Sequence, residues 1–324
     1  MIIRATLALA VLLGSVPLHA WAQGAWKPER NVEILVGTSP GGSIDRVARL
    51  AQRIVSEKGW LASSSVANRA GGGGAIAYQH MNQNPGGHHI AIGSLTMITN
   101  NVAGKSDIGY SDVTPLALLV SEYVTFSVRS EAAIRTPGDL IERLRKDPAS
   151  ASFAVASALG GSNHIAGGMV LKGAGADPKK GRFIVFNSSG DSMTAVLGGH
   201  VDVLATSAST AIPQIQGGKL RMLAVAAPRR LAGALASVPT WRELGTDAVF
   251  SNWFAAIGPG RMTSAQVAYY DELFAKMVKT PEWQSSLEKF VWENDYLPSR
   301  ESRRFYEDQH NAVKAILPDL GVVK

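Results

Sequence analysis

The chain has no cysteine among its 324 residues. Disulfide bonds, thiolate nucleophiles, iron–sulfur clusters and cysteine-ligated zinc are therefore excluded. A strong excess of one charge is also missing, because 32 basic and 26 acidic side chains leave a net charge of only +6. No long basic run concentrates that charge, so the sequence does not indicate a nucleic-acid partner. The hydrophobic content of 46% is enough to bury a sizeable core, which excludes wholesale disorder.

Long apolar runs are scarce as well. The run at 5–16 follows Arg4, is closed by Pro17, and precedes the small-residue pattern Ala20-Trp21-Ala22. This is the pattern of a secretory signal, so we expect residues 1–22 to be a cleavable signal peptide. The run is too short to span a bilayer, and the next candidate, at 114–128, is interrupted by a glutamate. The mature chain is therefore expected to be soluble and exported, to the periplasm in a two-membrane bacterium.

Strand-like and helix-like segments alternate along the rest of the chain. Short apolar runs are each followed by glycine or small polar residues and then by apolar residues at helical spacing. The expected strands lie at 32–38, 65–68, 89–94, 152–156, 182–186, 201–205 and 220–226. Capping patterns at Thr136 and Thr263 mark two further helix starts, and the C-terminal part from about Ser264 is mostly helical. This order predicts an α/β fold with parallel-core sheets flanked by helices.

Two strand–Gly–Gly–Ser–helix units stand out. Gly41-Gly42-Ser43 follows the first expected strand, and Gly160-Gly161-Ser162 follows the strand at 152–156. Ligands of open α/β sheets bind beyond the carboxyl ends of strands, and helix starts there offer free N–H groups to an anion. Two such corners facing one cleft would hold a small anion from both sides. Ordinary turn chemistry explains the same residues, and spacing alone leaves both interpretations open.

Other motifs point to little further chemistry. Gly71–Gly74 does not fit a dinucleotide loop, and Gly217-Gly218-Lys219 lacks the residues of a phosphate loop. His88 and His89 are adjacent, so on a strand they point to opposite faces, and we expect no metal site and no cofactor. Asp45 is interpreted as a helix first-turn acid that orders the glycine loop. A hydrolase built on Ser43 or Ser162 with His164 stays an alternative that requires a close Ser–His pair.

Several segments in order resemble the tripartite tricarboxylate transporter receptor family, also called Bug receptors. The similarity begins with Pro40-Gly41-Gly42-Ser43-Ile44-Asp45 and continues with Asn68-Arg69 before Gly71–Gly74. It covers essentially the whole expected mature chain. The remaining matching segments are Gly160–His164 with Ala166-Gly167, Leu197–Asp202, Gly217–Arg221, Val238–Thr240 and Asn252–Phe254.

The resemblance implies a two-domain periplasmic solute-binding protein of the type II-like class, with the ligand cleft between the domains. Its domain 1 would be residues 23–124 plus 251–324, and its domain 2 residues 125–250. The function implied is capture of a small carboxylate by backbone amides and hydroxyls, and delivery to membrane transporter subunits. The protein would be a monomer and not an enzyme. A ligand-loaded module that docks on a sensor protein is the alternative that the sequence cannot separate from transport.

Carried over residue by residue, the resemblance implies a set of ligand contacts. Domain 1 would contribute one group of residues around the first corner, and domain 2 would contribute another around the second. The residues implied are Gly41, Gly42, Ser43, Ser94 and Thr96 from domain 1, Ala158, Ser162, Asn163, Asn187 and Thr206 from domain 2, and Trp253 with Phe254 at the hinge side. Arg69 is expected either to touch the ligand or to hold the glycine loop, with both roles open.

The sequence also departs from the family pattern. Phe186-Asn187-Ser188 stands where the family commonly has Tyr-Lys-Gly, and Thr206 replaces a second acidic residue. Ala70 replaces the loop proline. These changes suggest a roomier, less charged site, and they favour a monocarboxylate or an aromatic acid over an amino acid, whose amine would lose a partner.

Overall fold

The computed structural model describes residues 26–323, so the expected signal peptide at 1–22 lies outside the described residues. Its strands are β1 (Val32–Val36), β2 (Ser64–Asn68), β3 (His89–Ser94), β4 (Val113–Arg129), β5 (Ser152–Ala156), β6 (Arg182–Phe186), β7 (Val203–Ser207), β8 (Leu220–Val225), β9 (Ser251–Pro259) and β10 (Leu297–Pro298). Within the described part of the chain, no helix is both long and apolar enough to cross a membrane.

The helices follow the strands as the alternation predicted. They are α1 (Ser43–Glu57), α2 (Ala75–Gln83), α3 (Leu95–Val102), α4 (Pro137–Lys146), α5 (Ser162–Gly173), α6 (Ser189–Leu197), α7 (Ala208–Gln216), α8 (Ser264–Met277), α9 (Pro281–Phe290) and α10 (Ser299–Ile316). The capping boxes expected at Thr136 and Thr263 are present, each with its side chain accepting a hydrogen bond from the third helical residue. Short 3₁₀ turns lie at Gly72–Gly74, Tyr110–Asp112, Pro178–Lys180 and Gly233–Leu235.

One ten-stranded sheet connects two α/β halves. Its order is β2-β1-β3-β9-β4-β7-β5-β6, with β8 and β10 also paired to β4. The strands β2, β1 and β3 are parallel, as are β6, β5 and β7, whereas β4 and β9 run antiparallel to their neighbours. The parallel-core sheets flanked by helices are therefore confirmed, as two outer parallel groups joined by antiparallel strands.

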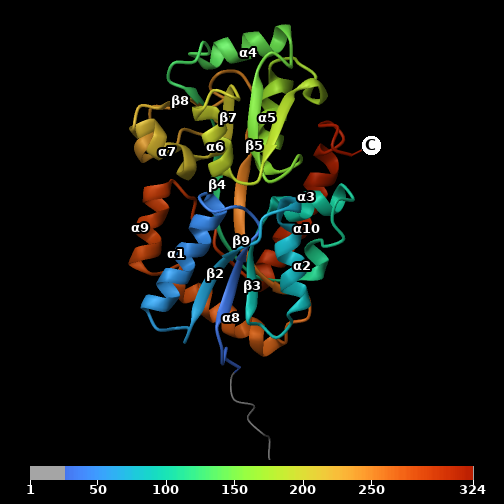
Figure 1. Ribbon diagram of the computed structural model, residues 1–324, viewed down its shortest axis with the longest axis vertical. Helices are drawn as coiled ribbons and strands as arrows, with labels where there is room; N and C mark the ends of the chain where they lie inside the picture. The colour runs from blue at the N-terminus through green and yellow to red at the C-terminus, as the bar shows by residue number, and fades with distance from the viewer. Residues whose placement is uncertain (1–25, 324) are drawn as a thin grey trace, which may run out of the picture.

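Strand β4 joins the two halves by changing partners along its length. Up to Tyr123 it pairs with β9, and from Val124 it pairs with β7 on one side and β8 on the other. Figure 1 shows β9 between the half that holds α4–α7 and the lower half with α1, α2 and α8, and the strand runs downward from Ser251 beside Tyr123 to Pro259 beside Val113. The lower half has a core on each face of its sheet, one under α1, α8 and α9 and one under α2, α3 and α10.

Strand boundaries differ from the expectation at β7. The apolar run predicted a strand at 201–205, but the strand begins two residues later, at Val203. The Asp202 carboxylate accepts hydrogen bonds from the backbone N–H and the hydroxyl of Ser152, at 2.8 and 2.6 Å. These bonds hold residue 202 in the turn before the strand, and β7 ends at Ser207.

Candidate functional site

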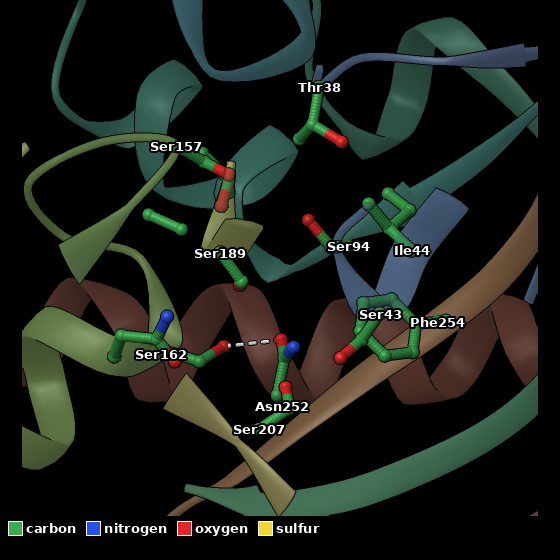
Figure 2. Close-up of a pocket in the computed structure, with 14 residues that line it drawn as sticks. Thr38, Ser43, Ile44, Ser94, Ser157, Ser162, Ser189, Ser207, Asn252 and Phe254 are labelled. Carbon is green, nitrogen blue, oxygen red and sulfur yellow. Dashed lines mark hydrogen bonds between the residues drawn. The ribbon is translucent and has the colours of Figure 1, made fainter. Parts of the chain in front are cut away.

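A cavity lies where the two halves meet, beyond the carboxyl ends of the parallel strands. Its lining is Thr38, Gly42, Ser43, Ile44, Ser94, Thr96, Ala156, Ser157, Ser162, Asn163, Ser189, Ser207, Asn252 and Phe254. Figure 2 shows the labelled hydroxyls of Thr38, Ser94 and Ser162 around one common space. The lining contains many hydroxyls and two amides but no ionisable side chain.

Five helices begin at this cavity. The residues that open or precede α1, α3, α5, α6 and α7 all belong to its lining. At the starts of α1, α3, α5 and α7 no side chain caps the first N–H groups. The first N–H groups of a helix have no partner within the helix, and together with the helix dipole they favour a negative charge. The cavity therefore attracts anions without any basic side chain in its wall.

Two buried polar atoms in the lining have no hydrogen-bond partner among the described residues. They are the Thr38 hydroxyl and the side-chain oxygen of Asn163. Buried polar groups are nearly always paired, because an unpaired one costs about 1–3 kcal/mol. The Asn163 oxygen can only accept a hydrogen bond, whereas the Thr38 hydroxyl can donate or accept, so a polar ligand with a donor could pair with these atoms.

The hydroxyl of Ser43 is already committed to a chain of hydrogen bonds between the halves. Ser209 donates to the Glu122 carboxylate at 2.8 Å, and Ser43 Oγ lies 2.8 Å from Ser209 Oγ. A hydroxyl has one proton, so Ser43 donates to Ser209, and Thr210, 3.0 Å from Ser43, donates to Ser43. Residue 43 is thus left with its backbone N–H as the donor for a ligand.

Glu122 is fully buried below the cavity. Besides Ser209, the indole N–H of Trp292 donates to its carboxylate at 3.1 Å. Burial raises the pKa of Glu122, because the ionised carboxyl loses its water, although the surrounding donors oppose that shift. Arg46 of α1 also reaches across and donates to the carbonyl of Ser209 at 3.0 Å. Side chains of α1 and α7 therefore hold the two halves together over the cavity.

A basic groove borders the cavity on its outer side. It is lined by Gly41 and Gly42 together with residues of α1 and α9, which include Arg46, Arg49, Arg53 and Lys289. Its positive charge lies next to the cavity but outside the lining, so it is suited to attracting an anion toward the entrance.

The structure brings seven of the predicted contact residues into the cavity lining. These are Gly42, Ser43, Ser94, Thr96, Ser162, Asn163 and Phe254. Gly41 instead faces the basic groove, and its N–H donates to Asp45.

Four predicted contact residues do not line the cavity. Asn187 is exposed, Thr206 is fully buried within β7, and Ala158 lies in the turn before α5. Trp253 is 1% exposed, packs on Tyr306 and donates to Gln309. Successive residues of a strand point to opposite faces, so β9 directs Asn252 and Phe254 into the cavity and Trp253 away from it.

Several lining residues were missed by sequence reasoning. Thr38, Ile44, Ala156, Ser157, Ser189, Ser207 and Asn252 line the cavity without having been predicted as contacts. Ser189 and Ser207 lie where β6 and β7 give way to helices, so the carboxyl-end rule could have indicated them. Ser157 has a left-handed backbone with a φ of 72°, which no local sequence signal indicates.

Asp45 and Arg69 lie beside the cavity. The Asp45 carboxylate accepts from the Gly41 N–H, from Arg49 and from Asn68, as an acid that orders the loop would. Burial acts to raise the pKa of Asp45, but these hydrogen bonds outweigh it and leave the pKa lowered. Arg69 is absent from the lining, and its backbone N–H donates to the carbonyl of Val36.

The Ser–His pair that a hydrolase requires is not formed by Ser162 and His164. The Ser162 hydroxyl donates to Asn252 at 2.7 Å, the contact drawn in Figure 2. His164 Nδ1 accepts from the backbone N–H of Gly160 at 3.0 Å, and burial lowers the pKa of His164 to about 4. The imidazole therefore fixes the turn before α5.

The fold and the cavity together define a two-domain solute-binding protein. The chain belongs to the tripartite tricarboxylate transporter family receptors, whose family model matches residues 47–322. A UPF0065 protein of Cupriavidus necator is 26% identical over 100% of this chain and 98% of its own. BugT of Bordetella pertussis is 24% identical over 78% of this chain and 77% of its own.

Solved structures share the fold. The periplasmic binding protein BugD superposes with a TM-score of 0.83 and 22% identity, over 92% of this chain and 100% of its own. MatC of Rhodopseudomonas palustris, solved with bound malate, gives a TM-score of 0.79 and 20% identity over 90% and 99% of the two chains. A second R. palustris protein, solved with adipate, gives a TM-score of 0.81 and 21% identity, over 91% of this chain and 98% of its own. The resemblance found in the sequence motifs is thereby confirmed.

Proposed function

We propose that this protein is an exported receptor that captures a small carboxylate in the cavity and delivers it to membrane subunits of a tripartite tricarboxylate-type transporter. The observation that carries the proposal is the convergence of five helix starts on a cavity without ionisable lining residues. Such a site stabilises a carboxylate by N–H groups and hydroxyls. The malate and adipate bound by the two R. palustris proteins belong to this chemical class.

In this proposal the ligand contacts come from both halves. Backbone N–H groups at Ser43 and Ser162, which open α1 and α5, hold the carboxylate. The hydroxyls of Thr38, Ser94 and Thr96 line the same wall. Asn163 offers its oxygen to a donor elsewhere on the ligand, such as a hydroxyl group.

Closure of two domains completes the site. We assign residues 23–124 plus 251–324 to domain 1 and residues 125–250 to domain 2. The change of partners in β4 between Tyr123 and Val124 supports this division. The protein acts as a monomer in the periplasm after removal of residues 1–22, and the loaded form docks transiently on the transporter.

A thermal-shift screen tests carboxylate binding. The panel contains mono-, di- and tricarboxylates, acidic amino acids and aromatic acids, each beside its amide. A ligand at 100 times its Kd adds about 2.7 kcal/mol to the free energy of unfolding, which raises the Tm by several degrees. We expect one class of acids to shift the Tm and the matching amides to leave it unchanged.

Protein refolded from denaturant provides the control for a ligand that copurifies and already fills the cavity. Equal shifts with an acid and its amide, or no shift with any acid after refolding, would contradict the proposal. Delivery is tested by uptake of the labelled acid in cells with and without this protein and the membrane subunits.

A further inference from the structure

Three potential metal ligands converge outside the cavity. The carboxylate of Glu33 lies 3.7 Å from His80 Nε2 and 3.7 Å from His89 Nε2. The three ligand atoms all lie within 4.8 Å of one another. Each side chain is between 23% and 28% exposed, so the cluster is partly enclosed but open to solvent.

The sheet and α2 together build this cluster. Glu33 of β1 and His89 of β3 are direct partners in the parallel register, so their side chains project from the same face. Leu35 and Ala91, the next residues on that face, are buried in the core under α2. His80 lies in the last turn of α2, and its imidazole lies beside Glu33 and His89. The spacing of histidines in the sequence could not indicate this cluster, because His89 lies beside Glu33 and His80 and does not act with its neighbour His88.

The distances suit a shared cation better than direct hydrogen bonds. Direct N–H···O bonds are about 2.7–3.2 Å long, shorter than both contacts to Glu33. Two ligand atoms about 2.0–2.2 Å from one tetrahedral zinc ion are roughly 3.4 Å apart, so a small inward movement would complete the geometry. The imidazole rings meet edge to face, with centroids 5.6 Å apart, so neither ring stacks on the other.

The donor set also matches the chemistry of zinc. Two imidazoles and one carboxylate form a common three-ligand zinc set that leaves the fourth position to water.

We infer that Glu33, His80 and His89 bind one Zn²⁺ ion, with the fourth position open to water. The ion would link α2 to β1 and β3 at the amino-terminal ends of these strands. The cavity lies at their carboxyl ends, with Thr38 five residues beyond Glu33. Figure 1 shows α2 and β3 in the half of the molecule that also holds α1 and α8. Zinc binding is therefore expected not to require a small carboxylate bound in the cavity.

Titration calorimetry of tag-free, chelator-treated protein with Zn²⁺ tests the site. We expect one zinc ion per chain. The double variant His80→Gln/His89→Gln should lose this binding, and Glu33→Gln should weaken it about tenfold or more. Wild-type affinity should fall in acidic solution, because protons compete with zinc for the imidazoles. Substitution by Co²⁺ should give the visible absorption of a four-coordinate site.

His200→Gln is the matched control, since His200 is exposed and lies outside the cluster. It should bind zinc like the wild type. Circular dichroism and the Tm in chelator establish that each variant is folded. Absence of stoichiometric zinc binding by the wild type, or unchanged binding by the folded double variant, would overturn the inference.

Discussion

At the scale of single residues, the cavity is defined by atoms that lack partners as much as by atoms that have them. The Ser43 and Ser162 hydroxyls both donate to protein groups, whereas the buried Thr38 hydroxyl has no partner among the described residues. The ligand is therefore expected to bond to Thr38 directly and to Ser43 and Ser162 mainly through their backbone N–H groups.

Replacement of Thr38 by valine should separate binding from stability. Thr38→Val removes one hydroxyl with little change of shape, so we expect the Kd for the acid found by screening to rise up to about tenfold. The free energy of unfolding should stay unchanged or increase, because an unpaired buried hydroxyl is removed. Calorimetric titration and urea denaturation measure the two quantities.

Thr114→Val provides the matched control. The buried Thr114 hydroxyl donates to the carbonyl of Pro259, away from the cavity lining. This variant should lose about 1–3 kcal/mol of stability and keep the wild-type Kd. A Thr38→Val variant that binds the acid as tightly as the wild type would remove Thr38 from the site.

At the scale of elements, the glycine loop before α2 supports the cavity wall. Gly71, Gly72, Gly73 and Gly74 all have positive φ values. The side chain of Asn100 donates to the carbonyl of Gly72 at 2.7 Å. A Cβ on Gly73 would lie 2.4 Å from Asn100 Nδ2 and 2.7 Å from Thr96 Cγ2. The loop therefore touches Thr96, which lines the cavity.

Gly73→Ala should consequently weaken both stability and binding. The φ of +62° and the two close contacts together should cost roughly 2–4 kcal/mol of unfolding free energy. Displacement of Thr96 should also raise the Kd for the acid. Gly104→Ala isolates the backbone contribution, because Gly104 has a φ of +66° with nothing within 4 Å of the added Cβ. Equal denaturation midpoints and Kd values for the two variants would show that the loop does not support the wall.

Element order was largely predictable from the sequence, whereas the facing of side chains was not. The strands at 152–156 and 182–186 were predicted with their observed bounds, because short apolar runs end there at polar residues. Trp253 was expected at the site from the family resemblance, and no local pattern tells which face of β9 meets the cavity. Asn187, also expected from the resemblance, lies two residues before Ser189, the lining residue that opens α6. The direction of these side chains could not be predicted, because register and helix starts depend on tertiary contacts.

At the scale of the whole molecule, hydrogen bonds between α1 and α7 hold the halves together. Ser209 is central, because it accepts from Ser43, donates to Glu122 and offers its carbonyl to Arg46. These bonds cross between the two halves, so they stabilise the arrangement in which α1 and α7 lie together.

Ser209→Ala should therefore favour an open form. The variant removes a donor from buried Glu122 and an acceptor from Ser43, at a cost of about 1–3 kcal/mol to the closed state. Without ligand, its radius of gyration in X-ray scattering should exceed that of the wild type, and saturating acid should restore the smaller value. Ser286→Ala is the control, since the Ser286 hydroxyl bonds only within α9. Identical scattering from Ser209→Ala and wild type would show that the hydrogen bonds of Ser209 do not hold the two halves together.

The most direct test of the central claim is a crystal structure of the protein with the acid that gives the largest thermal shift. The carboxylate should lie in the cavity, with its oxygens about 3 Å from the backbone N–H groups that open α1 and α5, and with Thr38 as a further donor. A carboxylate paired instead with Arg46, Arg49 or Arg53 in the basic groove, or bound elsewhere on the molecule, would contradict recognition by helix starts and hydroxyls.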